Sequence, residues 1–232
     1  MALPKLETPV YETVIPSTGQ TIEYRPFLVK EEKILMMAQE SKDSAQALQA
    51  LKKIISSCTF GKVDPNTLTT YDAEYIFLQL RIKSVGETTE FQIKDEETGT
   101  PVSVTVDLTE VEVSGPDEKP ESHIKLNDSI GMTLKEVTLK DAIGLTGADL
   151  NDVTTLVASV VDTIYDEDTV YKKENISKDE LSAFIESMNH KQLELIQNFI
   201  QGQPNISKEV TFTGPTGHVN TITLRGLQDF FA

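Results

Sequence analysis

The stretch that decides the fold is EVTFTGPTGHVNTITL, residues 209–224. Apolar and polar residues alternate on both sides of a central turn, Gly214–His218, and a period of two is typical of a β-strand with one buried face. Glycine permits the positive φ that tight turns often require. The stretch therefore predicts a β-hairpin whose strands are Glu209–Phe212 and Thr221–Leu224.

Two earlier segments repeat this pattern of alternating strands around a polar turn that contains Thr-Gly. Their strand pairs are Tyr11–Ile15 with Gln20–Tyr24, and Glu90–Ile93 with Val102–Val106. The turns between them are Pro16–Gly19 and Asp95–Gly99. The chain is therefore predicted to contain three β-hairpins, near its N-terminus, in its middle and near its C-terminus.

Helical patterns fill the spaces between the hairpins, because apolar residues there recur every three or four positions. The first predicted helical stretch covers 30–58, with a break near 41–43, and the second runs from the capping box Thr69–Asp72 to about Val85–Gly86. A third helix is predicted over 149–164. A fourth begins with the capping box Ser177–Glu180, and a fifth follows Asn189 and ends at Gly202. The strongest apolar stripe lies in 149–164. The resulting fold class is α+β, with a helical core and three β-hairpins.

The best candidate for a linker is 113–121, where Gly115, Pro116 and Pro120 stand among charged residues. It divides the chain into an N-terminal α+β part, 1–112, which holds two hairpins, and a mainly helical part, 122–232, which ends in a hairpin and a short helix. The alternative is that both parts pack as one compact domain.

Charge and hydrophobicity restrict the partners. The 232 residues include 37 acidic and 21 basic ones, giving a formal charge of −16, which repels the phosphate backbone of nucleic acids. A basic protein is a binding partner that this negative charge would allow. No apolar run approaches the ~20 residues of a membrane helix, and Met1–Lys5 lacks the features of a signal peptide. We expect a chain that folds in a cytoplasm and binds neither nucleic acid nor membranes.

Motifs for metal binding and catalysis are absent from the sequence. The three histidines, His123, His190 and His218, are far apart, and the single cysteine, Cys58, lies on an apolar helix face. No nucleophile elbow, phosphate-binding glycine loop or dinucleotide fingerprint is present. We therefore expect no enzyme, no catalytic residue, no metal or cofactor, and no small-molecule substrate.

An acidic cluster offers one alternative. Asp162, Asp166, Glu167 and Asp168 carry the carboxylate oxygens that Ca²⁺ prefers, but they lack the glycine and spacing of an EF-hand loop. A solvated acidic loop is the favoured interpretation.

Binding of other proteins is the class of function that remains, and the candidate binding surfaces are strand edges and hairpin tips. At the C-terminus, Leu227, Phe230 and Phe231 lie at i, i+3 and i+4 of a helical turn. They either pack on their own core, which is the favoured interpretation, or dock into a neighbour. The candidate interface residues are Thr18, Gly19, Gly214, Gly217, Arg225, Leu227, Phe230 and Phe231.

Several segments spread over nearly the whole chain carry a resemblance to a known family. They are Leu3–Leu6, Pro16–Gly19, Tyr24–Lys33, Tyr75–Arg81, Lys83–Glu87, Leu224–Leu227 and Asp229–Phe231. In this order they resemble the baseplate hub assembly proteins of T-even-like contractile-tailed phages, the myoviruses. Relatives of this kind often carry cysteine pairs at hairpin tips, in the manner of zinc ribbons. Here Gly214 and Gly217 have the matching two-residue gap but cannot bind metal, so the tip must hold by turn chemistry and hydrogen bonds.

The resemblance implies a non-enzymatic structural or assembly protein of the tail baseplate hub, with other hub or tail proteins as partners. Its place would be the virion tail baseplate, or the cytoplasm of the infected bacterium during assembly. Two alternatives stay open: a transient assembly chaperone that is absent from the mature virion, and an unrelated acidic intracellular adaptor.

Overall fold

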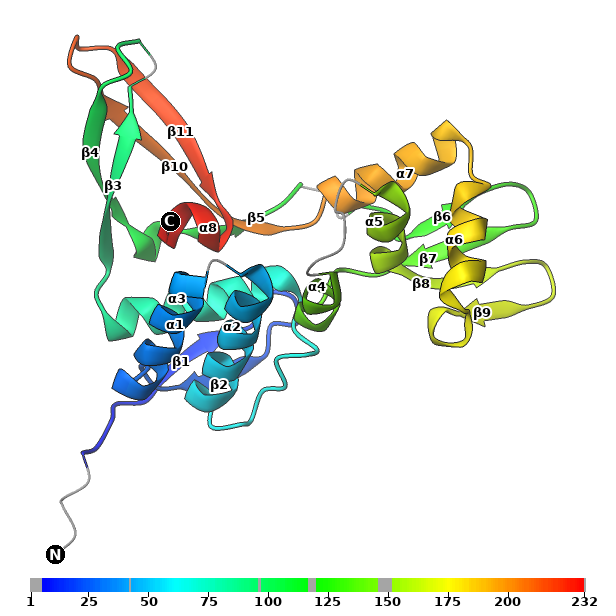
Figure 1. The fold of residues 1–232 in the computed structure, drawn as a ribbon, viewed down its shortest axis with the longest axis horizontal. Helices are drawn as coiled ribbons and strands as arrows, with labels where there is room; N and C mark the ends of the chain where they lie inside the picture. The colour runs from blue at the N-terminus through cyan, green and yellow to red at the C-terminus, as the bar shows by residue number, and fades with distance from the viewer. Residues whose placement is uncertain (1–5, 42, 96, 117–119, 146–151, 232) are drawn as a thin grey trace, which may run out of the picture. The chain divides into compact units, whose positions relative to one another are not determined.

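The computed structural model describes residues 6–41, 43–95, 97–116, 120–145 and 152–231, without the side chain of Phe231. The chain folds as two compact units, Met1–Ser114 with Asn205–Ala232, and Gly115–Pro204 (Figure 1). Helices alternate with short antiparallel strands in small sheets. The predicted α+β class is thus confirmed.

The three predicted hairpins are present in the first unit. Their strands are β1 (Tyr11–Val14) with β2 (Thr21–Tyr24), β3 (Thr88–Lys94) with β4 (Pro101–Asp107), and β10 (Asn205–Thr213) with β11 (Val219–Arg225). The registers follow the alternation, since Phe91 lies opposite Val104 and Val210 opposite Ile222. The apolar side chains of each strand therefore share one face.

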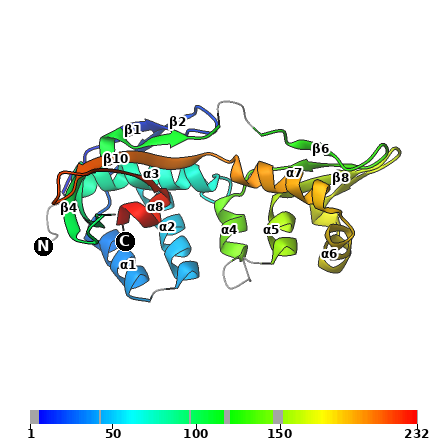
Figure 2. The same cartoon turned by 90° about the horizontal axis from the view of Figure 1, so that it is seen from above.

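Three helices complete the N-terminal part of this unit. They are α1 (Val29–Ser41), α2 (Ser44–Cys58) and α3 (Thr70–Ser84). Asp43 caps α2 at the predicted break, and the capping box of Thr69 and Asp72 begins α3. Figure 2 shows the β1–β2 hairpin on one side of α3, with α1 and α2 on the other.

The hairpins β3–β4 and β10–β11 lie together and form what we call the arm (Figure 1). Their inward side chains share a core with α3, with the short helix η1 (Leu108–Glu110) and with the C-terminal helix α8 (Gly226–Phe231). The buried members are Leu78, Ile82, Val104, Val106, Leu108, Val111, Ile206, Val210, Phe212, Leu224 and Phe230. Strand β10 also pairs with β5 (Glu112–Ser114), with Asn205 opposite Ser114.

The second unit holds a four-stranded antiparallel sheet in the order β6-β7-β8-β9. Its elements are β6 (His123–Lys125), β7 (Gly131–Leu134), α4 (Leu139–Leu145), α5 (Val153–Val160), β8 (Val161–Tyr165), β9 (Val170–Lys172), the short helix η2 (Lys173–Asn175), α6 (Lys178–Glu186) and α7 (His190–Gln201). Capping boxes begin α6 at Ser177, as predicted, and α7 at Asn189. The sheet and helices enclose a separate apolar core.

The prediction of one helix over 149–164 is wrong for its last four residues, 161–164. Helix α5 ends at Val160 and β8 follows directly, while 149–151 lie outside the described residues. The β-branched residues Val161, Thr163 and Ile164 suit a strand, and Ile164 pairs with Met132 on the buried face of the sheet. Pairing between distant segments thus outweighed the local helical period.

The two units also differ from the expected division at 113–121. The chain leaves the first unit after Ser114, as that linker suggests, but it returns at Asn205. The third hairpin, which we expected in the part 122–232, belongs to the first unit because β10 pairs with β5 and packs on the arm core. This long-range pairing leaves no local signal in the sequence.

A buried ion pair joins β2, α1 and α2. Arg25 Nη2 lies 2.9 Å from Glu31 Oε1, and the two side chains are only 9% and 3% exposed. Ser57 Oγ donates to Glu31 Oε1 at 2.7 Å, and the Leu28 N–H donates to Oε2 at 2.9 Å. Burial alone would raise the pKa of Glu31, but the hydrogen bonds from Arg25, Ser57 and Leu28 outweigh it and lower that pKa to about 2.

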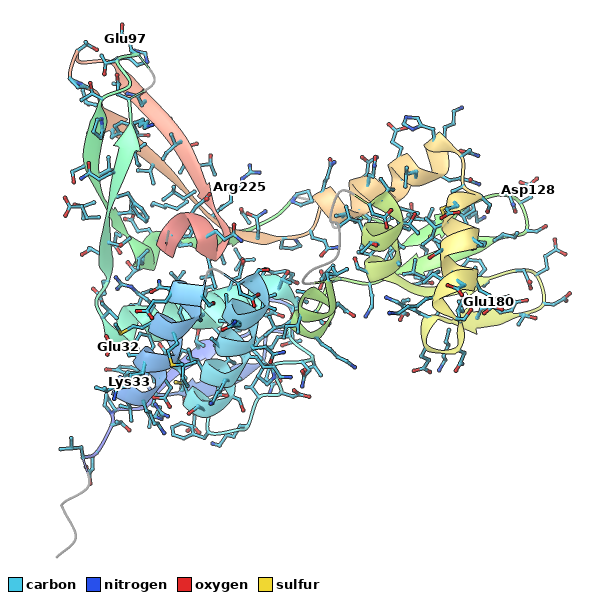
Figure 3. All side chains as sticks on the ribbon, in the orientation of Figure 1. Glu32, Lys33, Glu97, Asp128, Glu180 and Arg225 are labelled. Carbon is cyan, nitrogen blue, oxygen red and sulfur yellow. The ribbon has the colours of Figure 1, made fainter. Side chains whose placement is uncertain are left out.

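We predict that Glu31→Gln lowers the free energy of unfolding by about 3 kcal/mol at pH 7, since one pKa unit corresponds to about 1.4 kcal/mol. A depressed pKa stabilises the fold above the ordinary value of 4.5, and this contribution is lost as the pH falls toward 2. Urea titrations between pH 7 and pH 3 should therefore show a shrinking difference. The control Glu32→Gln, at an exposed position of α1 (Figure 3), should change little. A pH-independent difference would contradict this account.

Candidate protein interface

The candidate residues fall at three places in the first unit. Thr18 and Gly19 form the β1–β2 turn, Gly214 and Gly217 the β10–β11 turn, and Arg225, Leu227 and Phe230 the end of β11 with α8. The side chain of Phe231 lies outside the described part. The β1–β2 hairpin lies apart from the arm tip (Figure 1), so these residues do not form one continuous surface.

The tip of the first hairpin is fixed to its own fold. The N–H and hydroxyl of Ser17 donate to the carboxylate of Asp72 at 2.9 and 2.6 Å, and Asp72 is only 1% exposed at the start of α3. Thr18 and Gly19 stay exposed beside this contact, and Gly19 adopts a φ of +70°. The glycine is thus explained by the turn itself.

The tips of the two arm hairpins are joined by hydrogen bonds. Asn220 Nδ2 donates to Asp95 Oδ2 at 2.7 Å, and both residues are buried. Thr216 Oγ1 donates to Glu97 Oε2 at 2.5 Å. We call these two contacts the latch. Figure 3 places Glu97 at the tip of the arm and Arg225 near its base.

Asp95 is held on its second oxygen as well. The hydroxyl and the N–H of Thr98 each donate to Oδ1 at 2.7 Å. These bonds from Thr98, together with the one from Asn220, hold the pKa of Asp95 below its ordinary value. The carboxylate therefore stays charged at neutral pH and serves as the acceptor on which the latch depends.

The two glycines of the third hairpin have different roles. A Cβ on Gly214 would lie 2.1 Å from Asp95 Oδ2, so only glycine allows this close approach. Gly217 has open space around it, but its φ is +86°. Backbone bonds from Gly214 N to His218 O and from Gly217 N to Gly214 O complete the turn. The tip thus holds by turn chemistry and hydrogen bonds, as the sequence indicated.

The C-terminal segment packs on its own unit. Phe230 is 1% exposed in the arm core, and Leu227 packs partly buried against the same cluster. Burial raises the pKa of Glu74, although the Leu227 N–H donates to its carboxylate and partly offsets this. Arg225 is exposed, and its N–H donates to Asp229 at 2.7 Å. Phe230 is therefore a core residue and offers no surface to a partner.

An exposed apolar face on α1 was missed from the sequence. Val29, Met36 and Met37 are 67%, 54% and 69% exposed, although helix α1 is otherwise charged on that side. Their spacing of i, i+7 and i+8 is the signal that could have revealed them, because it places them away from buried Ala38.

Among the described residues, no group of three or more His, Cys, Asp or Glu side chains is arranged to hold a metal ion. Asp166 accepts bonds from the N–H groups of Asp168 and Thr169 within its turn, as a solvated acidic loop would. Burial raises the pKa of the Cys58 thiol to about 11, which makes it a poor nucleophile. Within the described part of the chain, no helix combines the length and apolar character needed to cross a membrane.

We predict that Gly214→Ala and Gly217→Ala destabilise the fold for different reasons. The first should lower the free energy of unfolding by about 1–3 kcal/mol through overpacking against Asp95. The second should lower it by about 1–2 kcal/mol through backbone strain. In an Asp95→Ala background, urea titrations should show the effect of Gly214→Ala shrinking while that of Gly217→Ala persists. If Gly214→Ala lowers the free energy of unfolding equally with and without Asp95, then Gly214 is not needed for the approach of Asp95 in the latch.

The packing of Phe230 leads to a second stability prediction. Phe230→Ala should lower the free energy of unfolding by about 3–5 kcal/mol, because it leaves a cavity in the arm core. Arg225→Ala, five residues away and exposed, should change it by less than about 0.5 kcal/mol. Thermal unfolding of both variants checks this, and a small effect of Phe230→Ala would show that the C-terminal helix is not docked.

Comparison with known proteins identifies the family. The family model for the T4 bacteriophage base plate protein matches residues 8–232, which is nearly the whole chain. No curated protein and no solved structure matches at a significant level. The match confirms the resemblance to baseplate proteins of T4-like phages, and it spans both structural units. The chain therefore belongs to the T4 bacteriophage base plate protein family and is a structural protein of a phage baseplate.

Proposed function

We propose that this chain is built into the hub of the phage baseplate, where it binds neighbouring hub or tail proteins through the free strand edge of its arm. Membership of a baseplate family supports protein partners in a tail assembly. The location in the hub and the use of the arm as a contact surface go beyond the family match.

The outer edge of β11 carries this proposal. The Gly214–His218 backbone bond and the β10–β11 register fix which pairs exchange hydrogen bonds, and they turn the N–H groups of Thr221 and Thr223 away from β10. In the described part of the chain, no strand pairs with this edge. A seven-residue edge with free donors and acceptors is suited to accept a strand from a partner.

The surroundings of this edge favour binding. The latch and the arm core hold β11 in place before a partner arrives, so less conformational freedom is lost on association. Val219, at the start of the strand, is 58% exposed and offers apolar area beside the free backbone groups. The formal charge of −16 favours protein partners over nucleic acid.

A transient assembly chaperone would bind hub proteins with the same edge, and its absence from finished particles is what distinguishes it. The test therefore counts copies of this chain by mass spectrometry in purified particles of its phage. In parallel, the tagged chain is used as bait in infected cells. A fixed low copy number in particles, with hub proteins recovered on the bait, is the expected result.

The arm is tested in the same experiment with Thr223→Pro and the matched control Thr223→Ala. Proline removes an outward donor and leaves the β10–β11 ladder intact, so recovery of hub proteins should fall at least fivefold, whereas alanine should retain it. Thermal unfolding confirms that both variants fold. If the chain is recovered with hub proteins from cells but is absent from particles, it is an assembly chaperone. If it is found neither with hub proteins nor in particles, the baseplate hub assignment is refuted.

A further inference from the structure

The second unit contains a hollow of about 600 Å³ whose wall is rich in lysine. Its lining residues come from the stretch 135–181, namely Lys135 directly after β7, then α4, β8, β9, η2 and the start of α6. The lysines on its wall are Lys135, Lys140, Lys172, Lys173 and Lys178. All of them belong to one compact unit, so the hollow is defined within that unit alone.

The concentration of lysine here contrasts with the rest of the unit. Gly115–Pro204 contains eight lysines and no arginine, against 17 aspartates and glutamates. Five of those eight lysines line the hollow. A unit that is strongly acidic as a whole thus gathers most of its positive charge at one place, where it can create a locally positive potential.

The carboxylates of the hollow do not cancel this charge. Asp141 accepts from Lys135 Nζ at 2.8 Å and from Thr138 Oγ1 at 2.7 Å, so one of the five lysines is neutralised within the fold. Asp162 and Glu174 also lie on the wall. Within the described residues, Lys140, Lys172 and Lys178 form no ion pair, and all three are exposed.

Lys173 shows the effect of this crowding. Its ammonium group is partly buried, and it donates to the carbonyl of Ser159 at 3.4 Å. Burial lowers its pKa and the charge of Lys135 lowers it further, and together they outweigh the opposite effect of Asp141 and Asp162. An anionic group in the hollow would favour the charged form of Lys173 and would pair with the three free lysines.

We propose that this lysine-lined hollow is a docking site for an acidic segment of a partner protein. A few carboxylate side chains fit a hollow of this size, and they complement its charge. An extended nucleic-acid backbone would run from the hollow onto the acidic surface around it and be repelled there. The site is separate from the edge of β11, so it goes beyond the proposed function.

Fluorescence anisotropy with a labelled hexaglutamate peptide tests this site on the full chain, at about 50 mM salt, where screening is weak. The variant Lys172→Gln/Lys178→Gln removes two lysines of the wall. The matched control Lys125→Gln/Lys191→Gln removes the same charge from exposed positions of the same unit that lie outside the hollow. Circular dichroism verifies that both variants are folded.

The hollow variant should weaken hexaglutamate binding by about tenfold, and the control by less than about twofold. Hexaglutamine should not bind. Absence of hexaglutamate binding, or equal loss in both variants, would overturn the proposal. So would tighter binding of a single-stranded oligonucleotide at the same lysines. Because Thr223→Pro leaves the second unit intact, it should keep hexaglutamate binding, which separates failure of this site from failure of the arm.

Discussion

The pairing of β10 with β5 determines how the rest of this baseplate protein is arranged. Asn205 lies opposite Ser114, so the two points at which the chain enters and leaves the second unit are neighbours in one ladder. The 90 residues Gly115–Pro204 are thereby an insertion into the first unit, with a core of their own. Adjacent ends make such an insertion compatible with the parent fold, because the paired strands are not pulled apart.

The return of the chain to the first unit at Asn205 also places the third hairpin in the arm. Once β10 has paired with β5, the third hairpin packs its apolar face on β4 and α3, and its turn meets the turn of the second hairpin. The buried bond between Asn220 and Asp95 satisfies polar groups that the packing removes from water. Gly214 permits the approach by having no side chain. Hydrogen bonding thus fixes a tip that a metal cannot hold here.

The elements with local signals were predictable from the sequence. The hairpins were found from period-two alternation around Thr-Gly turns, and α3 and α6 from the capping boxes at Thr69 and Ser177. The sheet β6-β7-β8-β9 was not, because its strands of three to five residues do not flank a Thr-Gly turn of the kind that marked the equally short strands β1 and β2. The segment after Val160 carried a helical period that pairing with β7 overrode.

The surroundings of the candidate interface residues depend on burial and long-range contacts, which leave little signal in the sequence. Phe230 lies in the arm core, in agreement with the favoured interpretation that the C-terminal aromatic residues pack on their own core. The contacts between Asp95 and Asn220 span 125 positions, and the lysine-lined hollow collects side chains from five elements. Neither arrangement has a fixed spacing that a sequence motif could capture.

We propose that this chain is a built-in hub component that binds its neighbours through the arm. A cryo-electron microscopy map of purified baseplates tests it most directly. We expect density for this chain at the hub, with a strand of a neighbouring protein lying along β11. A map in which the chain is absent, or in which the outer edge of β11 faces solvent, would contradict it.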